Sequence, residues 1–492
     1  MCGVFGIHSA ERDVARVAYF ALFALQHRGQ ESAGIAVSDR GRLTVLRDMG
    51  LVAQVFDEEK LHALPGEVAI GHTRYSTTGS TLWANAQPLV HHGRTRTVAL
   101  GHNGNLTNTE ELRDALAADG IVLGATSDTE AIAALIAHDP APLSLAVAQA
   151  MTRLEGAYSI VALADGKLLG FRDPHGIRPL AIGRLVDEDG GEDWVLASET
   201  CALDLIGASF EREVRPGEVV VIDEDGLHST QALPEGRQAL CIFEHVYFAR
   251  PDSTLAGSEV HGVRVRMGER LAAEAPAEAD LVMPIPDSGT PAAVGFSRAS
   301  GIPYSEGLIK NRYVGRTFIQ PDDALRRQGI KMKFNPLAEV AGKRLVIVDD
   351  SIVLGSTMHQ LVNMLFEAGA AEVHVRVSSP PIVSPCFYGI DMADEEQLAA
   401  AHRSVEQMRE LIGATSLHYL SLDGMQAATR LPEASVCRAC FTREYPTRVP
   451  AERNLAKLRF EALPVGAGRA SAEADARRAK IPEGAASRPG AD

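Results

Sequence analysis

Cys2 is the residue of this chain whose type and position allow the most definite chemistry. The chain opens Met1-Cys2-Gly3-Val4, so removal of the initiator methionine would leave a cysteine at the N-terminus. Such a residue carries its own base, because an α-amine with a pKa of about 8 can take the proton of the attacking thiol near neutral pH. The alternative is an ordinary strand residue whose apolar neighbours pack inward.

Polar clusters further along the first half could complete a site around this thiol, since they lie where loops carry function. The clusters span residues 27–32, 72–77, 101–105 and 127–130. The side-chain amide of Asn103 and the backbone N–H of Gly104 are suitable donors for the oxyanion that forms when a thiol attacks an amide. The alternative for this pair is a simple turn.

Two charged residues of these clusters suit the two ends of an amino-acid substrate. Arg74 could bind a carboxylate through both of its terminal nitrogens, and Asp128 could pair with an ammonium group. The alternatives are a surface ion pair for Arg74 and a helix N-cap for Asp128.

A second set of polar residues follows an apolar strand in the second half. Residues 344–348 lead into Asp349 and Asp350, and then into a loop through Gly355 to an amphipathic helix. Adjacent carboxylates can bind ribose hydroxyls and Mg²⁺, and the free N–H groups at a helix start can bind a phosphate. The alternative is a strand end with solvated acids and a helix cap.

Two further segments of the second half could contact the same phosphate-bearing ligand. Residues 283–291 end another predicted strand and contain a glycine turn next to Ser288 that could cradle pyrophosphate. A basic segment runs from Lys310 through Arg316 to Lys333, which in an acidic protein is typical of a mobile cover over a bound anion. Its alternative is a solvated charged face.

Four of the six cysteines form a possible metal site in the second half. They are Cys241, Cys386, Cys437 and Cys440, of which the last two form a C-x-x-C pair. Four thiolates suffice for zinc or for an iron–sulfur cluster, and their spacing does not choose between the two. The remaining Cys201 is expected to pack as a small apolar side chain.

Composition limits the number of domains, the partners and the compartment that we expect for this protein. The chain has 492 residues, a formal net charge of -16 and 46% hydrophobic residues, which indicates two or more globular domains. The negative charge disfavours nucleic acid as a partner. Since we find neither a leader pattern nor an apolar run of about 20 residues, we expect a cytoplasmic protein with no membrane partner.

Hydrophobic periodicity indicates the elements that must position these residues. Up to about residue 235, short strands outnumber helices, which predicts sheets sandwiched between helices. The strands expected there are 32–38, 43–47, 68–72, 98–102, 158–163, 195–198 and 219–222. The helices expected there are 14–26, 109–118 and 128–137.

Strands and helices alternate from about residue 258, which predicts a parallel α/β sheet. The expected strands are 281–285, 345–348 and 373–377, and the expected helices are 263–272, 292–299 and 357–367. From residue 464 to 492 the sequence is rich in Ala, Gly, Pro, Ser and Arg, so we expect a disordered tail.

The Cys2 opening and the polar clusters together resemble the class II, N-terminal-nucleophile glutamine amidotransferases over residues 2–235. The resemblance implies an α+β domain of the four-layer αββα N-terminal-nucleophile hydrolase type. It also implies that Cys2 attacks the glutamine amide and that Asn103 and Gly104 form the oxyanion hole. The residues implied to bind glutamine are Arg74, Asp128, Gly29 and Thr77.

The pattern from Cys241 to about Pro446 resembles the type I phosphoribosyltransferases, with a predicted α/β parallel-sheet domain over residues 236–463. The residues implied to bind phosphoribosylpyrophosphate are Asp349, Asp350, Ser351, Gly355, Ser356, Thr357, Lys310 and Arg316. One Mg²⁺ per subunit is implied at Ser288, Asp349 and Asp350. The basic segment is implied to close over the substrate and to help form an ammonia channel from Cys2.

The two halves together resemble the glutamine phosphoribosylpyrophosphate amidotransferase family over about residues 2–450. This resemblance implies an enzyme that makes 5-phosphoribosylamine, glutamate and pyrophosphate from glutamine, water and phosphoribosylpyrophosphate, in the first committed step of purine synthesis. It further implies a homotetramer inhibited by purine nucleotides. Leu354 stands where the family usually has arginine, which leaves a phosphate or nucleotide contact at that position open.

The Bacillus-like branch of this family carries a structural 4Fe-4S cluster, one per subunit. The residues that match its four ligand positions are Cys241, Cys386, Cys437 and Cys440. A short propeptide often precedes the nucleophile in that branch, whereas only Met1 does so here, so we expect removal of methionine rather than self-cleavage.

Two alternatives to this assignment are kept. Another class II amidotransferase would share Cys2 but would need a different acceptor domain, against which residues 346–357 argue. A non-enzymatic nucleotide-binding regulator could use the cluster as an oxygen sensor, against which the full set of polar residues around Cys2 argues.

Overall fold

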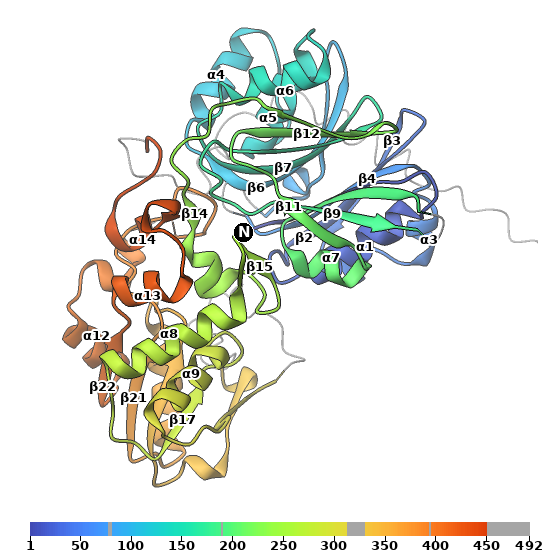
Figure 1. Ribbon diagram of the computed structural model, residues 1–492. Coiled ribbons are helices and arrows are strands. Elements are labelled where there is room, and N and C mark those ends of the chain that lie inside the picture. The colour runs from blue at the N-terminus through green and yellow to red at the C-terminus, as the bar shows by residue number, and fades with distance from the viewer. Residues whose placement is uncertain (77–80, 188–189, 312–329, 393–394, 450–492) are drawn as a thin grey trace, which may run out of the picture.

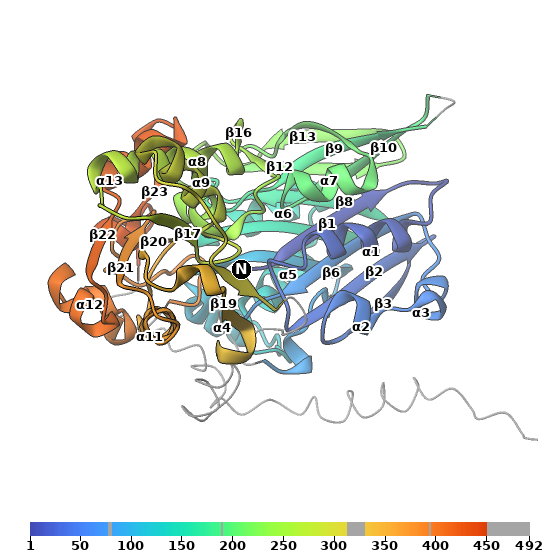
Figure 2. The same cartoon turned by 90° about the horizontal axis from the view of Figure 1, so that it is seen from below.

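The computed structural model describes residues 1–76, 81–187, 190–311, 330–392 and 395–449. These residues form two lobes, each built on its own sheets (Figure 1). The N-terminus lies between the lobes in both ribbon views (Figures 1 and 2). The residues around Cys2 are therefore in reach of both lobes.

The first lobe holds two antiparallel sheets that lie face to face. Its strands are β1 (Gly3–His8), β2 (Ser32–Asp39), β3 (Arg42–Met49), β4 (Val68–Arg74), β5 (Leu89–His92), β6 (Thr97–Leu106), β7 (Gly156–Ala164), β8 (Lys167–Arg172), β9 (Ala181–Val186), β10 (Glu192–Ala197), β11 (Ser209–Glu213), β12 (Glu218–Asp223) and β13 (Gly226–Gln231). One sheet has the order β11-β9-β10-β1-β4-β2-β3 and the other β13-β12-β8-β7-β6-β5. Val4 and Ile70 of the first sheet share an apolar core with Val161 and Val220 of the second.

Helices cover the outer faces of these two sheets. The first sheet carries α1 (Val14–Ala24) and α7 (Thr200–Ile206), and the second carries α4 (Thr109–Ala118), α5 (Asp128–His138) and α6 (Leu143–Met151). The short elements α2 (Val52–Val55), α3 (Glu58–His62) and η1 (Trp83–Asn85) complete the lobe. The order helix, sheet, sheet, helix confirms the predicted four-layer fold.

The second lobe is built on a parallel sheet of order β17-β20-β21-β22. Its strands are β17 (Leu281–Pro284), β20 (Arg344–Asp349), β21 (Glu372–Val377) and β22 (Ser416–Tyr419). Helices α8 (Val260–Glu274) and α9 (Thr290–Ser300) cover one face, and α11 (Ser356–Glu367) and α12 (Val405–Ile412) cover the other. Because both faces are covered, β20 is an almost uninterrupted apolar run, as the sequence predicted.

The remaining described elements surround this sheet and join it to the first lobe. They are β14 (Leu240–Cys241), η2 (Glu244–Phe248), β15 (Thr254–Leu255), β16 (Ser258–Glu259), β18 (Leu308–Lys310), β19 (Phe334–Pro336), η3 (Ala338–Val340), η4 (Glu395–Gln397), η5 (Ala399–Ala401), α13 (Leu422–Thr429), η6 (Glu433–Ser435), β23 (Val436–Cys437) and α14 (Ala439–Thr442). β14 pairs in parallel with β23, which ties the C-terminal part of the lobe back to the link between the lobes.

Every strand and helix predicted from periodicity is present, with ends displaced by a few residues. The short helices α6, α7 and α13, of nine, seven and eight residues, were not predicted. The predicted tail over residues 464–492 lies outside the described residues.

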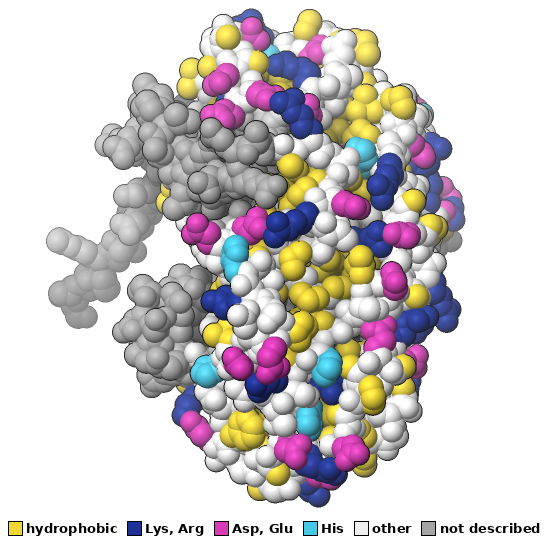
Figure 3. Space-filling view, turned by 90° about the vertical axis from the view of Figure 1, so that its left-hand side faces the viewer, with side chains coloured by type: hydrophobic (Ala, Val, Ile, Leu, Met, Phe, Trp, Pro, Cys, Tyr) yellow, Lys and Arg dark blue, Asp and Glu magenta, His cyan; other side chains and the backbone are white. Residues whose placement is uncertain are grey.

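Two features of the structure can be compared with the membrane and nucleic-acid partners that the composition disfavours. Within the described part of the chain, no helix is both long enough and apolar enough to span a bilayer. On the face shown in Figure 3, basic side chains are interspersed with acidic ones rather than gathered in a stripe. A phosphate backbone binds such stripes, so this face does not resemble a nucleic-acid surface.

Candidate active sites and the junction between the lobes

Cys2 lies directly before β1, at the end of the first sheet that faces the second lobe. Only 8% of the residue is exposed. Its backbone N–H donates to Oδ1 of Asn103 at 3.2 Å, its thiol donates to the carbonyl of Tyr75 at 3.6 Å, and its carbonyl accepts from Nε of Arg28 at 2.9 Å. Three separate segments therefore fix the position of the predicted nucleophile.

Asn103 and Gly104 lie within β6 rather than in a turn, so the turn alternative is wrong for them. The Asn103 side chain is buried, and its Nδ2 has no hydrogen-bond partner among the described residues. Because Oδ1 of the same amide binds the Cys2 backbone, this unpaired donor is held beside the nucleophile. An unsatisfied buried donor in such a place suits an anion that forms only during reaction.

Gly29 and Arg74 are brought together at the same end of the sheet. A side chain at position 29 would lie 2.5 Å from the backbone of Thr73 and 2.6 Å from that of Arg74, so only glycine permits this approach. Arg74 is buried and lies 3.8 Å from Glu31, which excludes the surface alternative for it. Thr77, predicted for the same pocket, lies outside the described residues.

Asp128 is the first helical residue of α5, while Ser127 occupies the N-cap position, so the cap alternative for Asp128 is wrong. Its carboxylate accepts the N–H of Leu106 at 2.9 Å and lies 3.5 Å from Nδ1 of His102. Burial alone would raise the pKa of Asp128, but His102 and the backbone N–H outweigh it, and the pKa lies below its ordinary value. The group is therefore an anion at neutral pH.

The predicted acceptor residues meet at the ends of two neighbouring parallel strands of the second lobe. β20 ends in Asp349 and Asp350, and Ser288 lies in the turn after β17, where its hydroxyl hydrogen-bonds Asp350. Burial and the charge of Asp350 raise the pKa of Asp349, and burial also raises the pKa of Asp350. A cation bound beside these two buried carboxylates would therefore be favourable. The pair lies at the edge of a parallel sheet, where ligands bind.

The loop after Asp350 leads into the N-terminus of α11. Gly355 is the N-cap residue of α11 and adopts a left-handed conformation at φ 80°, and as a glycine it offers no side-chain cap to the first N–H groups of the helix. Leu354 is 54% exposed. Lys310 forms an ion pair with Asp287 in the turn after β17, whereas Arg316 and most of the basic segment lie outside the described residues.

The four cysteines gather where β14 meets β23. Cys241 lies opposite Cys437 in that pair, Cys440 follows in α14, and the sulfur of Cys386 accepts the N–H of Tyr388 at 3.4 Å. Burial raises the pKa of Cys241 to about 11 and raises those of Cys437 and Cys440 further. The other cysteines add to each rise, so the four thiols lie close to one another.

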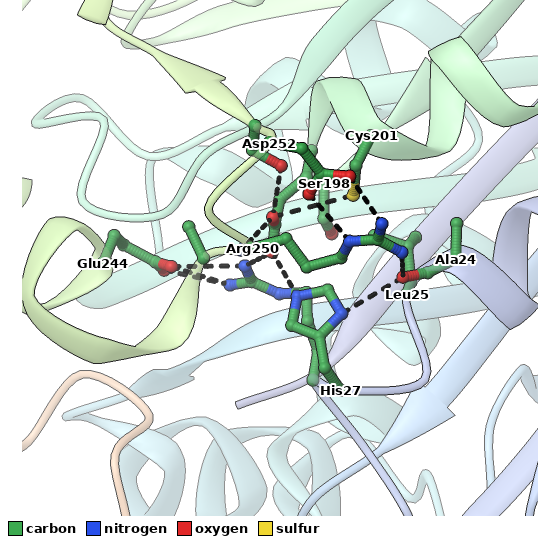
Figure 4. Close-up of polar contacts among 12 residues, drawn as sticks. Ala24, Leu25, His27, Ser198, Cys201, Glu244, Arg250 and Asp252 are labelled. Atoms are coloured by element: carbon green, nitrogen blue, oxygen red, sulfur yellow. Dashed lines mark hydrogen bonds and ion pairs between the residues drawn. The ribbon is translucent and has the colours of Figure 1, made fainter. Parts of the chain in front are cut away.

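A group of buried charges that the sequence did not predict joins the two lobes. We call it the junction network: Arg28, Arg178, Glu199 and Glu244, whose side chains are 0% exposed. Arg28 pairs with both glutamates, and Glu244 also pairs with Arg178 at 3.2 Å. Figure 4 shows Glu244, His27 and Arg250 around this network, where the His27 ring and the backbone N–H of Arg250 bind Glu199.

Pairing is what allows these charges to be buried. Burial would raise the pKa of Glu199, but the charges of His27 and Arg28 outweigh it and hold the pKa well below its ordinary value. The sequence carried two weak signals for the network: Arg28 stands beside Gly29 in a polar cluster, and Glu244 follows two apolar residues after Cys241. Neither signal shows that the two residues meet.

A second contact joins the cysteine-bearing segment to the strand of the predicted oxyanion hole. The Nδ2 of Asn105 donates to the carbonyl of Phe387 at 3.1 Å. Gly389, at φ 105°, lies so close to Gly104 that a side chain at position 389 would be 3.0 Å from the Gly104 backbone. The second lobe thus forms part of the wall behind β6.

Comparisons with known proteins agree with this geometry. A glutamine amidotransferase domain family matches residues 72–204, and a phosphoribosyl transferase domain family matches residues 262–379. The amidophosphoribosyltransferase of Mycobacterium bovis is 51% identical over 488 residues, which cover 96% of this chain and 91% of the relative. That of Synechococcus elongatus is 53% identical over 466 residues, which cover 94% of each chain.

Two solved structures share the whole fold. One, described as the allosteric regulatory enzyme of purine biosynthesis, matches with a TM-score of 0.87 and 44% identity, over 93% of this chain and 98% of that one. The other is the glutamine phosphoribosylpyrophosphate amidotransferase of B. subtilis complexed with ADP and GMP. It matches with a TM-score of 0.85 and 44% identity, over 92% of this chain and 98% of that one.

The fold, the two sites and these matches define a glutamine amidotransferase joined to a phosphoribosyltransferase. The chain belongs to the amidophosphoribosyltransferase family, whose reaction is the first step of purine biosynthesis. This membership confirms the predicted fold and enzyme class, and it sets aside both alternatives, another class II amidotransferase and a non-enzymatic regulator.

Proposed function

We propose that Cys2 is the nucleophile of the glutaminase site and that the ammonia it releases reacts at the second lobe. The sulfur attacks the side-chain amide carbon of glutamine, ammonia leaves as a thioester forms, and water then hydrolyses the thioester to glutamate. Ammonia attacks C1 of phosphoribosylpyrophosphate and displaces pyrophosphate, which yields 5-phosphoribosylamine. The unpaired Nδ2 of Asn103 beside Cys2 is the observation that carries this proposal.

The residues around Cys2 take distinct parts in this reaction. Nδ2 of Asn103 and the N–H of Gly104 stabilise the oxyanion. Buried Arg74 binds the glutamine carboxylate, and the anionic Asp128 binds its ammonium group. Gly29 and Thr77 line the same pocket.

The ends of β17 and β20 bind phosphoribosylpyrophosphate with one Mg²⁺ per subunit. Ser288, Asp349 and Asp350 offer the oxygen donors that Mg²⁺ prefers, and the burial that raises the pKa of both aspartates supports a cation at this place. When bound, the cation neutralises the pyrophosphate leaving group. The phosphate is held by Ser351, Gly355, Ser356 and Thr357, and the cover over the substrate includes Lys310 and Arg316.

Cys241, Cys386, Cys437 and Cys440 hold one structural 4Fe-4S cluster per subunit. Within the described part of the chain, no three His, Cys, Asp or Glu side chains converge on one point as metal ligands do. The cysteines gather where β14 meets β23, with Cys241 opposite Cys437. Four thiolates could hold zinc or an iron–sulfur cluster, and the match to the ligand positions of the Bacillus-like branch supports the cluster.

The remaining assignments follow from the family. We propose that residues 2–235 form the glutaminase domain, that 236–463 form the phosphoribosyltransferase domain and that 464–492 are a tail. The protein acts as a cytoplasmic homotetramer inhibited by purine nucleotides. The B. subtilis relative complexed with ADP and GMP supports the last of these statements.

The substitution Cys2→Ala should distinguish the activity of the first site from that of the second. Glutamine-dependent synthesis of phosphoribosylamine should fall by about a thousandfold or more, because the nucleophile is lost. Synthesis from high concentrations of ammonia should persist, because the acceptor site lies in the other lobe. Cys201→Ala is the matched control, since Cys201 is a buried thiol outside both sites. Loss of both activities in folded Cys2→Ala protein would contradict the two-site proposal.

Asp349→Asn together with Asp350→Asn should abolish synthesis from both glutamine and ammonia and weaken binding of Mg²⁺-phosphoribosylpyrophosphate, measured by calorimetry. Asp280→Asn is the control, because Asp280 pairs with Arg344 at the opposite ends of the same two strands. Unchanged ammonia-dependent synthesis in the double variant would show that the acceptor site lies elsewhere.

Protein purified without oxygen should be brown and contain about four irons and four sulfides per chain. Oxygen should bleach and inactivate it, and Cys437→Ser should be mostly insoluble, because the tie between β14 and β23 is lost. Cys201→Ser should keep its iron. A colourless, fully active preparation containing zinc would rule the cluster out.

A further inference from the structure

Arg178 has hydrogen-bonding capacity that the proposed reaction does not use. The residue lies in the loop between β8 and β9, and its side chain is 0% exposed. Its Nε donates to the carbonyl of Tyr388 at 2.8 Å and its Nη1 donates to Glu244 at 3.2 Å. Its Nη2 is buried and has no hydrogen-bond partner among the described residues.

Both partners of Arg178 belong to segments that carry one of the four cysteines each, Cys386 and Cys241. Tyr388 lies two residues after Cys386 and donates its own N–H to the Cys386 sulfur at 3.4 Å. Glu244 lies three residues after Cys241. Burial lowers the pKa of Arg178, but its electrostatic interactions with Cys241, Glu244 and Cys386 outweigh this effect and raise the pKa above its ordinary value. The guanidinium is therefore close to these two thiols.

Two physical requirements meet at this position. A buried guanidinium nitrogen without an acceptor is costly, and native proteins rarely leave one unpaired. A 4Fe-4S cluster with four thiolates carries a net negative charge, which is also costly to bury without a nearby cation. The junction network pairs two arginines with two glutamates, and Arg178 shares its glutamate in that network, Glu244, with Arg28.

We infer that Nη2 of Arg178 donates a hydrogen bond to a sulfur of the cluster and that the guanidinium supplies the positive charge that compensates it. This inference rests on the proposed 4Fe-4S cluster. Arg178 is then a positioning residue through which the first lobe binds a group whose ligands all come from the second lobe. Hydrogen bonds to sulfur and nearby charge set the reduction potential and the lability of such clusters.

The test compares Arg178→Gln and Arg178→Lys with the full-length wild-type protein, all purified without oxygen. Arg178→Gln removes the charge, and its cluster should bleach in air about tenfold faster, with a reduction potential shifted to more negative values. Arg178→Lys keeps the charge without the planar fork and should fall between the two. The measurements are iron and sulfide content, the rate of visible bleaching and an electron paramagnetic resonance titration.

Arg376→Gln is the matched control, because Arg376 is a buried arginine whose nitrogens bind the carbonyls of Ala275 and Pro276 instead. Its cluster should behave as in the wild type. If Arg178→Gln does not fold, the comparison of Arg178→Lys with Arg376→Lys decides the matter by the same measurements. Equal bleaching rates and potentials in all iron-loaded variants would overturn the inference alone, whereas wild-type protein without iron would overturn the cluster proposal itself.

Discussion

The buried contact between the two lobes is the constraint on which the rest of the structure depends. Arg28, Arg178, Glu199 and Glu244 are fully buried charges that come from both sides of that contact. An arginine or glutamate left alone in this place would be strongly destabilising, so each lobe needs the charges of the other. The pairing therefore fixes one relative position of the lobes and does not simply add to their attraction.

That position brings the chemistry of the two lobes together. Arg28 holds the carbonyl of Cys2 and also binds Glu244, which lies just after a cysteine of the second lobe. The segment that contains Cys386 packs against the strand of Asn103 and Gly104 through the contacts of Phe387 and Gly389. Residues of the second lobe thus lie against the strand of the proposed glutaminase site.

The sequence predicted what depends on local pattern. Apolar periods located the strands that carry Asn103 and Asp349, and residue chemistry identified the groups at their ends. What it could not predict are contacts between distant positions: Arg28 and Glu244 are 216 residues apart, and nothing in either neighbourhood indicates the pair. A charged residue that follows apolar ones, as Glu244 does, is a local sign of a buried ion pair, but it does not identify the partner.

The most direct test of the claim that the second lobe completes the glutaminase site is the ratio of glutamine-dependent to ammonia-dependent synthesis in Gly389→Ala. The new methyl group would press on the Gly104 backbone from 3.0 Å, and we expect this ratio to fall by about tenfold or more. Gly301→Ala imposes a similar left-handed strain at φ 75° with nothing within 4 Å, and it should leave the ratio unchanged. An unchanged ratio in Gly389→Ala would contradict the account.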